Sequence, residues 1–176
     1  ASIVPPGRRV PWLAVSGLVI LGLQIALGGW TSSNYAALAC PDIPTCQGEW
    51  WPVESNFAEG FILWRGLGIN YEFGVLDAPS RVAIHSAHRL GALATFTVLL
   101  LIGLRFRAGG LGAPLRQAGT LVLGAVTLQV LIGAGTVWFG LPLTLATAHN
   151  AAAALLLLAM INLNHTASFT ANQRWA

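Results

Sequence analysis

The chain contains no lysine and few charges of any kind. Charged residues make up 9% of its 176 residues, whereas a soluble domain needs about 25% to cover its surface. This composition excludes an ordinary water-soluble domain and indicates that lipid is the main solvent. The net charge of +3 is small and scattered, which argues against nucleic-acid binding and for a role in membrane orientation.

Acidic residues are absent outside one segment. All six lie between Asp42 and Asp77, whereas arginines lie at the other ends of the apolar segments, at Arg8, Arg9, Arg105, Arg107, Arg116 and Arg174. The positive-inside rule therefore predicts cytoplasmic termini and a long external loop, about 32–80. The expected location is a bacterial cytoplasmic (inner) membrane. The first apolar stretch is too long for a secretory signal and lacks an A-x-A-like site. The start at Ala1 instead of Met is compatible with a processed chain or a fragment.

Four apolar segments reach or approach the roughly 20 residues that span a bilayer. They cover residues 11–31, 82–104, 115–139 and 141–163. Because backbone groups in hydrocarbon must be satisfied within the segment, each is predicted to be a helix. We therefore expect an all-α membrane protein, in which residues 1–176 form a single four-transmembrane-helix bundle with a long external loop.

A short internal repeat has the pattern L-Q-x3-G-x2-T, at residues 23–31 and 128–136. In each case the following helix carries a histidine near its outer end. Two pseudo-repeated helix hairpins, parallel about an axis along the membrane normal, would produce this pattern. Chance similarity between glycine-rich membrane helices is the alternative.

His88 and His149 each lie about eight residues past the expected start of a helix, a depth of roughly 12 Å. Two imidazoles at the same depth, on helices that run in the same direction, could be the two axial ligands of a haem iron. Small residues nearby would leave space for the flat macrocycle between the helices: Gly91, Ala92, Ala148, Ala151 and Ala152. Zinc is disfavoured because no third or fourth Cys, His or carboxylate shares that depth. The alternative is that both histidines only make hydrogen bonds between helices.

Three other polar residues lie near the same outer surface. His85, one turn from His88, could bind a haem propionate, relay protons or act as a substitute ligand. Arg89 and Arg81 could pair with propionates, or could simply be interfacial arginines. His165 lies at the cytoplasmic end and is expected to be solvated.

The only two cysteines, Cys40 and Cys46, lie in the external loop. An oxidising compartment favours a structural disulfide, and a redox-active pair is the alternative. Later in the loop, Phe57, Phe61 and Trp64 follow helical spacing. This spacing predicts a short amphipathic helix on the membrane surface, or else an aromatic belt segment.

Several of these motifs together resemble the haem A synthase family over nearly the whole chain. They are the runs GGWTSSNY at 28–35 and AIHSAHRLG at 83–91, the Cys40–Cys46 loop, and the stretch 64–77 with its GINYE core. The resemblance implies eight helices in two similar halves in full-length members, which oxidise the C8 methyl of haem O to the formyl of haem A for cytochrome oxidase assembly.

The chain looks closest to the C-terminal half of that family, which implies half of an eight-helix protein. His88 and His149 would then ligate a resident haem b. The family's first half carries a glutamate three residues before its His-Arg pair, and His85 occupies that position here. The Glu-x-x-His-Arg pattern implicated in catalysis is therefore absent.

The leading interpretation is the haem b-binding half of a haem A synthase-like oxidoreductase, in which the iron transfers electrons or supports the structure. Its expected partners are haem O or haem A, membrane lipid, a second four-helix half or another copy, haem O synthase, and a quinol or other electron donor. The alternatives are a quinone-linked membrane thiol-disulfide oxidase and a non-catalytic membrane assembly subunit.

Overall fold

The computed structural model describes residues 6–72, 74–108 and 110–173. Five helices follow one another, with no β-strand in the described ranges beyond a single bridge between Cys46 and Glu49. They are α1 (Pro6–Ser33), α2 (Phe57–Gly60), α3 (Ala78–Ala108), α4 (Ala113–Trp138) and α5 (Leu143–Gln173). All but α2 are long and apolar enough to cross a membrane, which confirms the predicted all-α fold with four membrane-length helices.

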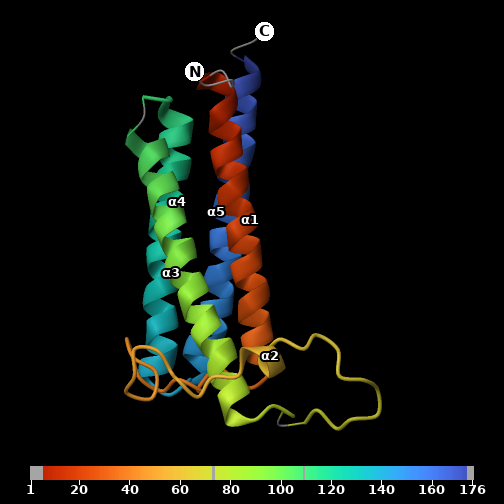
Figure 1. The fold of residues 1–176 in the computed structure, drawn as a ribbon. Coiled ribbons are helices and arrows are strands. Elements are labelled where there is room, and N and C mark those ends of the chain that lie inside the picture. The colour runs from red at the N-terminus through yellow and green to blue at the C-terminus, as the bar shows by residue number, and fades with distance from the viewer. Residues whose placement is uncertain (1–5, 73, 109, 174–176) are drawn as a thin grey trace.

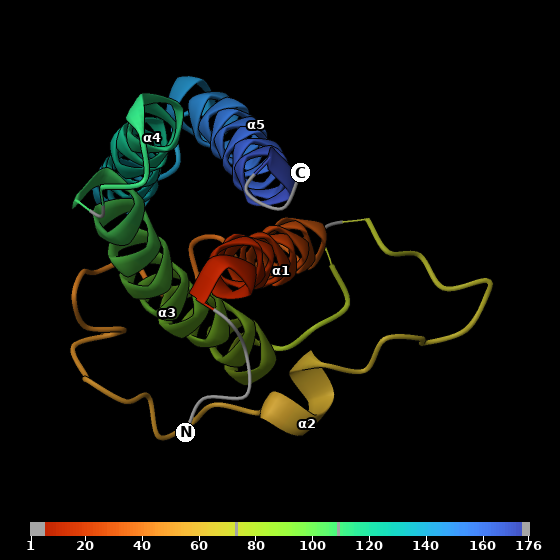
Figure 2. The same cartoon turned by 90° about the horizontal axis from the view of Figure 1, so that it is seen from above.

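The four long helices form a ring when viewed along the bundle (Figure 2). In that ring α1 contacts α3 and α5, and α4 also contacts α3 and α5. Neither diagonal pair, α1 with α4 or α3 with α5, makes contact within the described ranges. This arrangement suits two helix pairs, α1–α3 and α4–α5, related by an axis along the bundle.

The start of α1 and the end of α5 lie at the same end of the bundle, which we call the terminal end (Figure 1). The connection from α1 to α3 lies at the opposite end, which we call the loop end. Many large apolar side chains face outward, with Leu131 66% and Leu155 58% exposed. A surface of this kind is stable in lipid, because the hydrocarbon covers it.

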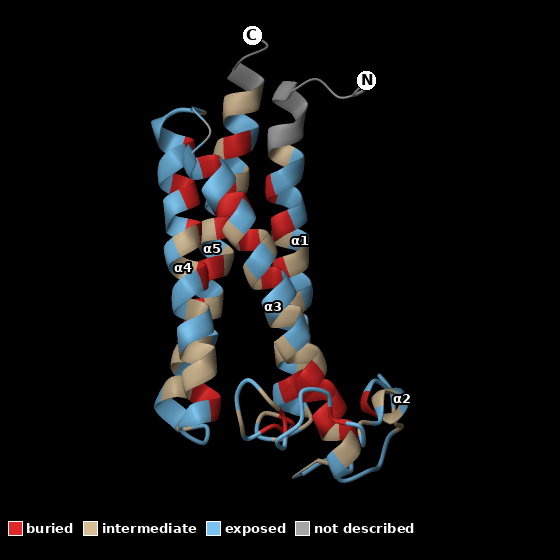
Figure 3. Ribbon diagram, turned by 60° about the vertical axis from the view of Figure 1, so that its left-hand side comes forward, coloured by how far each residue is buried: buried red, intermediate tan, exposed pale blue. Residues whose placement is uncertain are grey.

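The large apolar core occupies the terminal half of the bundle. It contains residues from all four long helices, among them Leu21, Leu99, Phe106, Val122 and Leu156. Figure 3 shows the buried residues gathered there and again near the loop. No comparable buried cluster joins the four helices beside His88 and His149 among the described residues.

The helices differ in length from the apolar segments. The structure begins α1 at Pro6 and ends α5 at Gln173, beyond the expected 11–31 and 141–163. Hydropathy marks where the hydrocarbon ends, whereas a helix continues as long as its backbone hydrogen bonds do. The expected amphipathic helix is reduced to α2, which contains Phe57 but not Phe61 or Trp64.

The loop is attached to the helices at several points. The Trp30 indole donates to the carbonyl of Gly60 at 3.0 Å, which ties the end of α1 to α2. A Cβ at Gly60 would lie 2.9 Å from the Ser80 carbonyl, so α2 packs directly on α3. At the start of α3, the Asp77 carboxylate accepts from the Ser80 amide at 2.9 Å, as a helix cap does.

Candidate functional site

His88 lies on α3, half-buried and facing α1. The Gln24 amide nitrogen lies 3.0 Å from His88 Nδ1 and 3.0 Å from the His88 carbonyl oxygen. Nε2 of His88 makes no hydrogen bond to the described residues. The ring is therefore held at one nitrogen, and the other is free to bind a ligand.

His149 lies on α5 and faces α4 in a corresponding way. The Gln129 amide nitrogen lies 3.3 Å from His149 Nε2. Here His149 Nδ1 and Gln129 Oε1 are buried and have no hydrogen-bond partner within the described part of the chain. Buried polar atoms are normally paired, so these two mark a place where a partner is missing.

The two histidines lie on diagonal helices and their glutamines on the other diagonal. Counted from the helix starts, His88 is ten residues into α3 and His149 six residues into α5. Because α3 extends further than α5 at the loop end, these offsets are consistent with one level in the bundle (Figure 1).

A haem is compatible with these residues. Within the described ranges, no group of three or more His, Cys, Asp or Glu side chains could hold a metal ion. Two imidazoles are too few for a closed zinc site but are enough for a haem, whose macrocycle supplies the other ligands. The large apolar core does not extend to the two rings, and His149 Nδ1 and Gln129 Oε1 are buried without a partner in the described part of the chain. Both observations agree with a group bound beside the rings.

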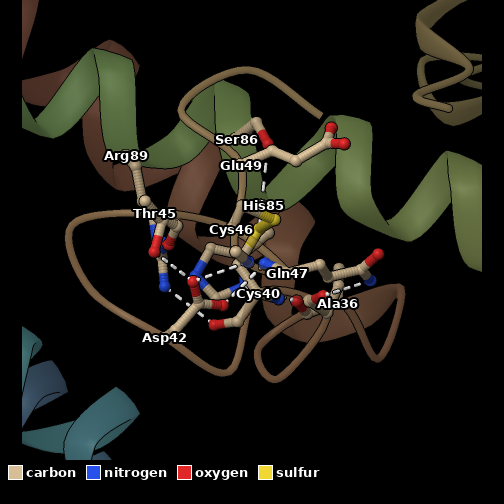
Figure 4. The surroundings of a disulfide bond; sticks show 12 residues. Ala36, Cys40, Asp42, Thr45, Cys46, Gln47, Glu49, His85, Ser86 and Arg89 are labelled. Carbon is tan, nitrogen blue, oxygen red and sulfur yellow. Dashed lines mark hydrogen bonds between the residues drawn. A yellow bond between two sulfur atoms is a disulfide. The ribbon is translucent and has the colours of Figure 1, made fainter. Parts of the chain in front are cut away.

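His85 faces the external loop. The Nδ1 atom lies 2.9 Å from the carbonyl oxygen of Ala36, and the Cys40 amide approaches the same nitrogen at 3.4 Å. One nitrogen cannot donate to the first and accept from the second, so the shorter contact, with Nδ1–H donating to Ala36, fixes the tautomer. Figure 4 shows the ring beneath the disulfide-closed turn.

Arg89 also binds the loop. Its guanidinium donates to the carbonyl oxygens of Thr45 and Cys40, both at 2.7 Å (Figure 4). Arg81 donates through Nε to the Leu76 carbonyl at 2.9 Å, one turn before its own position. The arginines predicted to meet propionates are thus engaged with backbone carbonyls in this structure.

The structure joins Cys40 and Cys46 by a disulfide, and both side chains are buried. The bond closes a turn that lies on α3, with Cys40 Sγ 3.8 Å from Ser86 Oγ. With His85 and Arg89, this turn forms a cluster separate from the glutamine–histidine pairs. His165 lies far along α5 at the terminal end and stacks on Phe169.

Sequence reasoning missed the two glutamines as partners of the histidines. The signal was present in the repeat, because Gln and Gly four residues apart lie on one face of a helix. Gly28 and Gly133 lie against the rings: a Cβ at Gly28 would be 3.2 Å from His88 Cε1, and one at Gly133 2.7 Å from His149 Cε1.

Comparison with known proteins agrees with this arrangement. The family model described as cytochrome oxidase assembly protein matches residues 2–161. The heme A synthase of Shewanella oneidensis is 44% identical over 94% of this chain and 48% of its own length. That of Nitrosospira multiformis is 30% identical over 86% of this chain and 38% of its own.

The heme A synthase of Rhizorhabdus wittichii is 28% identical over 87% of this chain and 40% of its own length. The chain thus spans about half the length, or less, of these relatives. No solved structure matches it. With a family model covering most of the chain, and a relative 44% identical over 94% of it, the chain belongs to the cytochrome oxidase assembly protein family that contains the haem A synthases.

Proposed function

We propose that this chain is the haem-binding four-helix unit of a haem A synthase, with the iron of a haem b held between His88 and His149. One observation carries the proposal. The two histidines lie on the diagonal helices α3 and α5, beside the part of the bundle that the apolar core does not fill. Cofactor sites in helix bundles are built in this way, from side chains on facing helices.

A haem with two histidine ligands supplies one-electron transfer, because no axial position remains open for oxygen. His88 and His149 would be its ligands. Arg89 and Arg81 stay candidates for the propionates only if they release the carbonyls of Cys40, Thr45 and Leu76. His85 stays a candidate auxiliary group only if it leaves Ala36. These residues support electron transfer or structural stabilisation better than oxidation of a methyl group.

Oxidation of the haem O methyl to the formyl of haem A belongs to the proposed whole protein. The chain spans about half of its relatives and has His85 in place of the glutamate of the Glu-x-x-His-Arg pattern. We therefore expect it to act with a second four-helix half or another copy. Haem O synthase and a quinol donor are the proposed neighbours in a bacterial cytoplasmic membrane.

The visible spectrum tests the proposal. The full chain, purified from bacterial membranes in detergent, should show the sharp reduced α-band of a low-spin haem, and pyridine treatment should identify haem b. His88→Ala and His149→Ala should each abolish this band. His165→Ala is the matched control, since His165 lies at the terminal end, and it should leave the spectrum unchanged.

A colourless wild-type protein would overturn the proposal, as would a band that survives in both His88→Ala and His149→Ala. A colourless but folded protein would favour the non-catalytic assembly subunit, because the hydrogen bonds from Gln24 and Gln129 give both histidines a structural role. Thiol turnover with quinone in a colourless protein would favour the disulfide oxidase.

A further inference from the structure

Gln24 holds His88 through two groups at once. Its amide nitrogen is 3.0 Å from the ring Nδ1 and 3.0 Å from the carbonyl oxygen of the same residue. A contact to both the ring and the backbone of one residue restricts rotation of the ring about its side-chain bonds. It also leaves Nε2, the nitrogen that commonly binds iron, without a protein partner among the described residues.

Glycines on both helices leave the space that Gln24 and the ring of His88 occupy. Gly91 lies one turn after His88 on α3, and a Cβ there would collide with Gln24 Oε1. Gly28 lies one turn after Gln24 on α1, and its missing side chain makes room for the ring. Gln24 and Gly28 therefore act together, as one face of α1 against which the ring of His88 packs.

The second repeat builds the same face. Gln129 and Gly133 on α4 contact the ring of His149, as Gln24 and Gly28 contact His88. In both places the pattern Q-x3-G faces a histidine ring, but Gln24 meets Nδ1 of His88 and Gln129 meets Nε2 of His149. The second pair is looser, because its contact is 3.3 Å and it leaves Gln129 Oε1 and His149 Nδ1 unpaired.

We infer that Gln24 is a positioning residue that fixes the ring plane of His88. The inference rests on the proposed haem site. A side-chain amide suits the task because it offers a donor and an acceptor side by side. In this structure the amide nitrogen of Gln24 donates to Nδ1. If Nε2 binds iron, Nδ1 carries the proton, and the amide would turn so that Gln24 Oε1 accepts from Nδ1–H.

The chemistry of the replacement decides the direction of the effect. Gln24→Glu provides a carboxylate that accepts strongly from Nδ1–H and makes the imidazole a more basic ligand. This favours the oxidised iron and lowers the midpoint potential. Gln24→Leu removes the partner of Nδ1–H, so the potential should rise, the ring should lose its fixed plane, and the affinity for haemin should fall about tenfold or more.

The experiment compares the midpoint potential, the low-spin EPR g-values and haemin titrations of the purified full chain in four forms. These are the wild type, Gln24→Leu, Gln24→Glu and the control Gln117→Leu, which removes an exposed glutamine of α4 far from both histidines. We expect opposite shifts of potential in the two Gln24 variants, g-values changed from the wild type in Gln24→Leu, and no change in Gln117→Leu. Opposite shifts would not follow from a merely structural role.

The outcomes separate this inference from the proposed function. A wild type that holds haem, with Gln24→Glu and Gln24→Leu at the wild-type potential and g-values, would overturn the inference while the haem site stands. A wild type without haem would overturn both. If Gln24→Leu does not fold, Gln24→Glu still decides, since it keeps a polar side chain of the same length.

Discussion

At the scale of single residues, Asp42 organises the disulfide-closed turn. Its carboxylate accepts from the Thr45 hydroxyl, from the Gly48 amide at 3.0 Å and from the Gln47 amide at 2.6 Å (Figure 4). The Thr45 hydroxyl first, and then these amides, lower the pKa of Asp42 from 3.8 to about 2. The ionised carboxylate is therefore part of the folded turn.

A pH dependence follows from this shift. Because the pKa of Asp42 is lower in the folded turn, its stabilising effect is complete above about pH 4 and is lost as the pH falls toward 2. Hydrogen exchange of residues 40–49 should therefore accelerate between pH 4 and 2, after correction for the intrinsic exchange rate. Asp42→Asn should exchange faster at pH 7 and lose this additional acceleration.

Glu54→Gln serves as the control, because Glu54 is exposed and its side chain makes no hydrogen bond to the described residues. It should behave as the wild type does. Equal exchange in Asp42→Asn and the wild type at pH 7 would show that the carboxylate does not hold the turn.

Sequence reasoning at this scale found the histidines but not their partners. His88 and His149 stand out because ionisable groups are rare in apolar helices. The partners of Arg89 are backbone carbonyls of Cys40 and Thr45, and no sequence pattern marks a carbonyl. Gln24 was visible within the repeat, but which helix it meets depends on the packing of α1 against α3.

At the scale of helices, α3 and α4 approach closely at two glycines. A Cβ at Gly119 would lie 2.9 Å from the Gly103 carbonyl oxygen and 3.1 Å from the Arg107 backbone nitrogen. Backbone atoms of a packed helix cannot move aside as a flexible side chain can. Small residues at such contacts let membrane helices pack closely.

We therefore expect Gly119→Ala to destabilise the bundle by about 1–3 kcal/mol, because it overpacks the interface. Thermal unfolding of the detergent-solubilised chain measures this. The matched control is Gly124→Ala on the same helix, where a Cβ would meet nothing within 4 Å. That variant should be neutral or slightly more stable, since alanine favours helix. Equal unfolding temperatures in the two variants would contradict close packing at Gly119.

The helices themselves were predictable, and their ends were not. Length and hydropathy alone predict four spans, and the structure contains them. Residues 164–173 are polar but still belong to α5, and Asn164 joins α5 to α1 there by donating to the carbonyl of Ala14 at 2.9 Å. Such a contact depends on the neighbouring helix, which hydropathy does not identify.

At the scale of the whole molecule, the distribution of charge predicts the orientation in the membrane. The structure separates the acidic loop from Arg105, Arg107 and Arg116 by the length of α3 and α4 (Figure 1). From the positive-inside rule we propose that the loop lies outside and the α3–α4 turn lies in the cytoplasm.

Cysteine labelling in intact cells tests this orientation. Both natural cysteines are in the disulfide, so single cysteines can be placed elsewhere. Trp50→Cys lies in the loop and Ala113→Cys begins α4, and both positions are exposed. A membrane-impermeant maleimide should label the first in intact cells and the second only after permeabilisation. The reverse labelling pattern would show that the orientation is opposite to the proposed one.

The apolar core of the bundle lies only toward its terminal half, and this has a consequence for biogenesis. Because this core does not include His88 or His149, we expect the helices to associate through that half before the group that these histidines are proposed to hold is bound. Synthesis of the chain and supply of the cofactor would then not need to coincide.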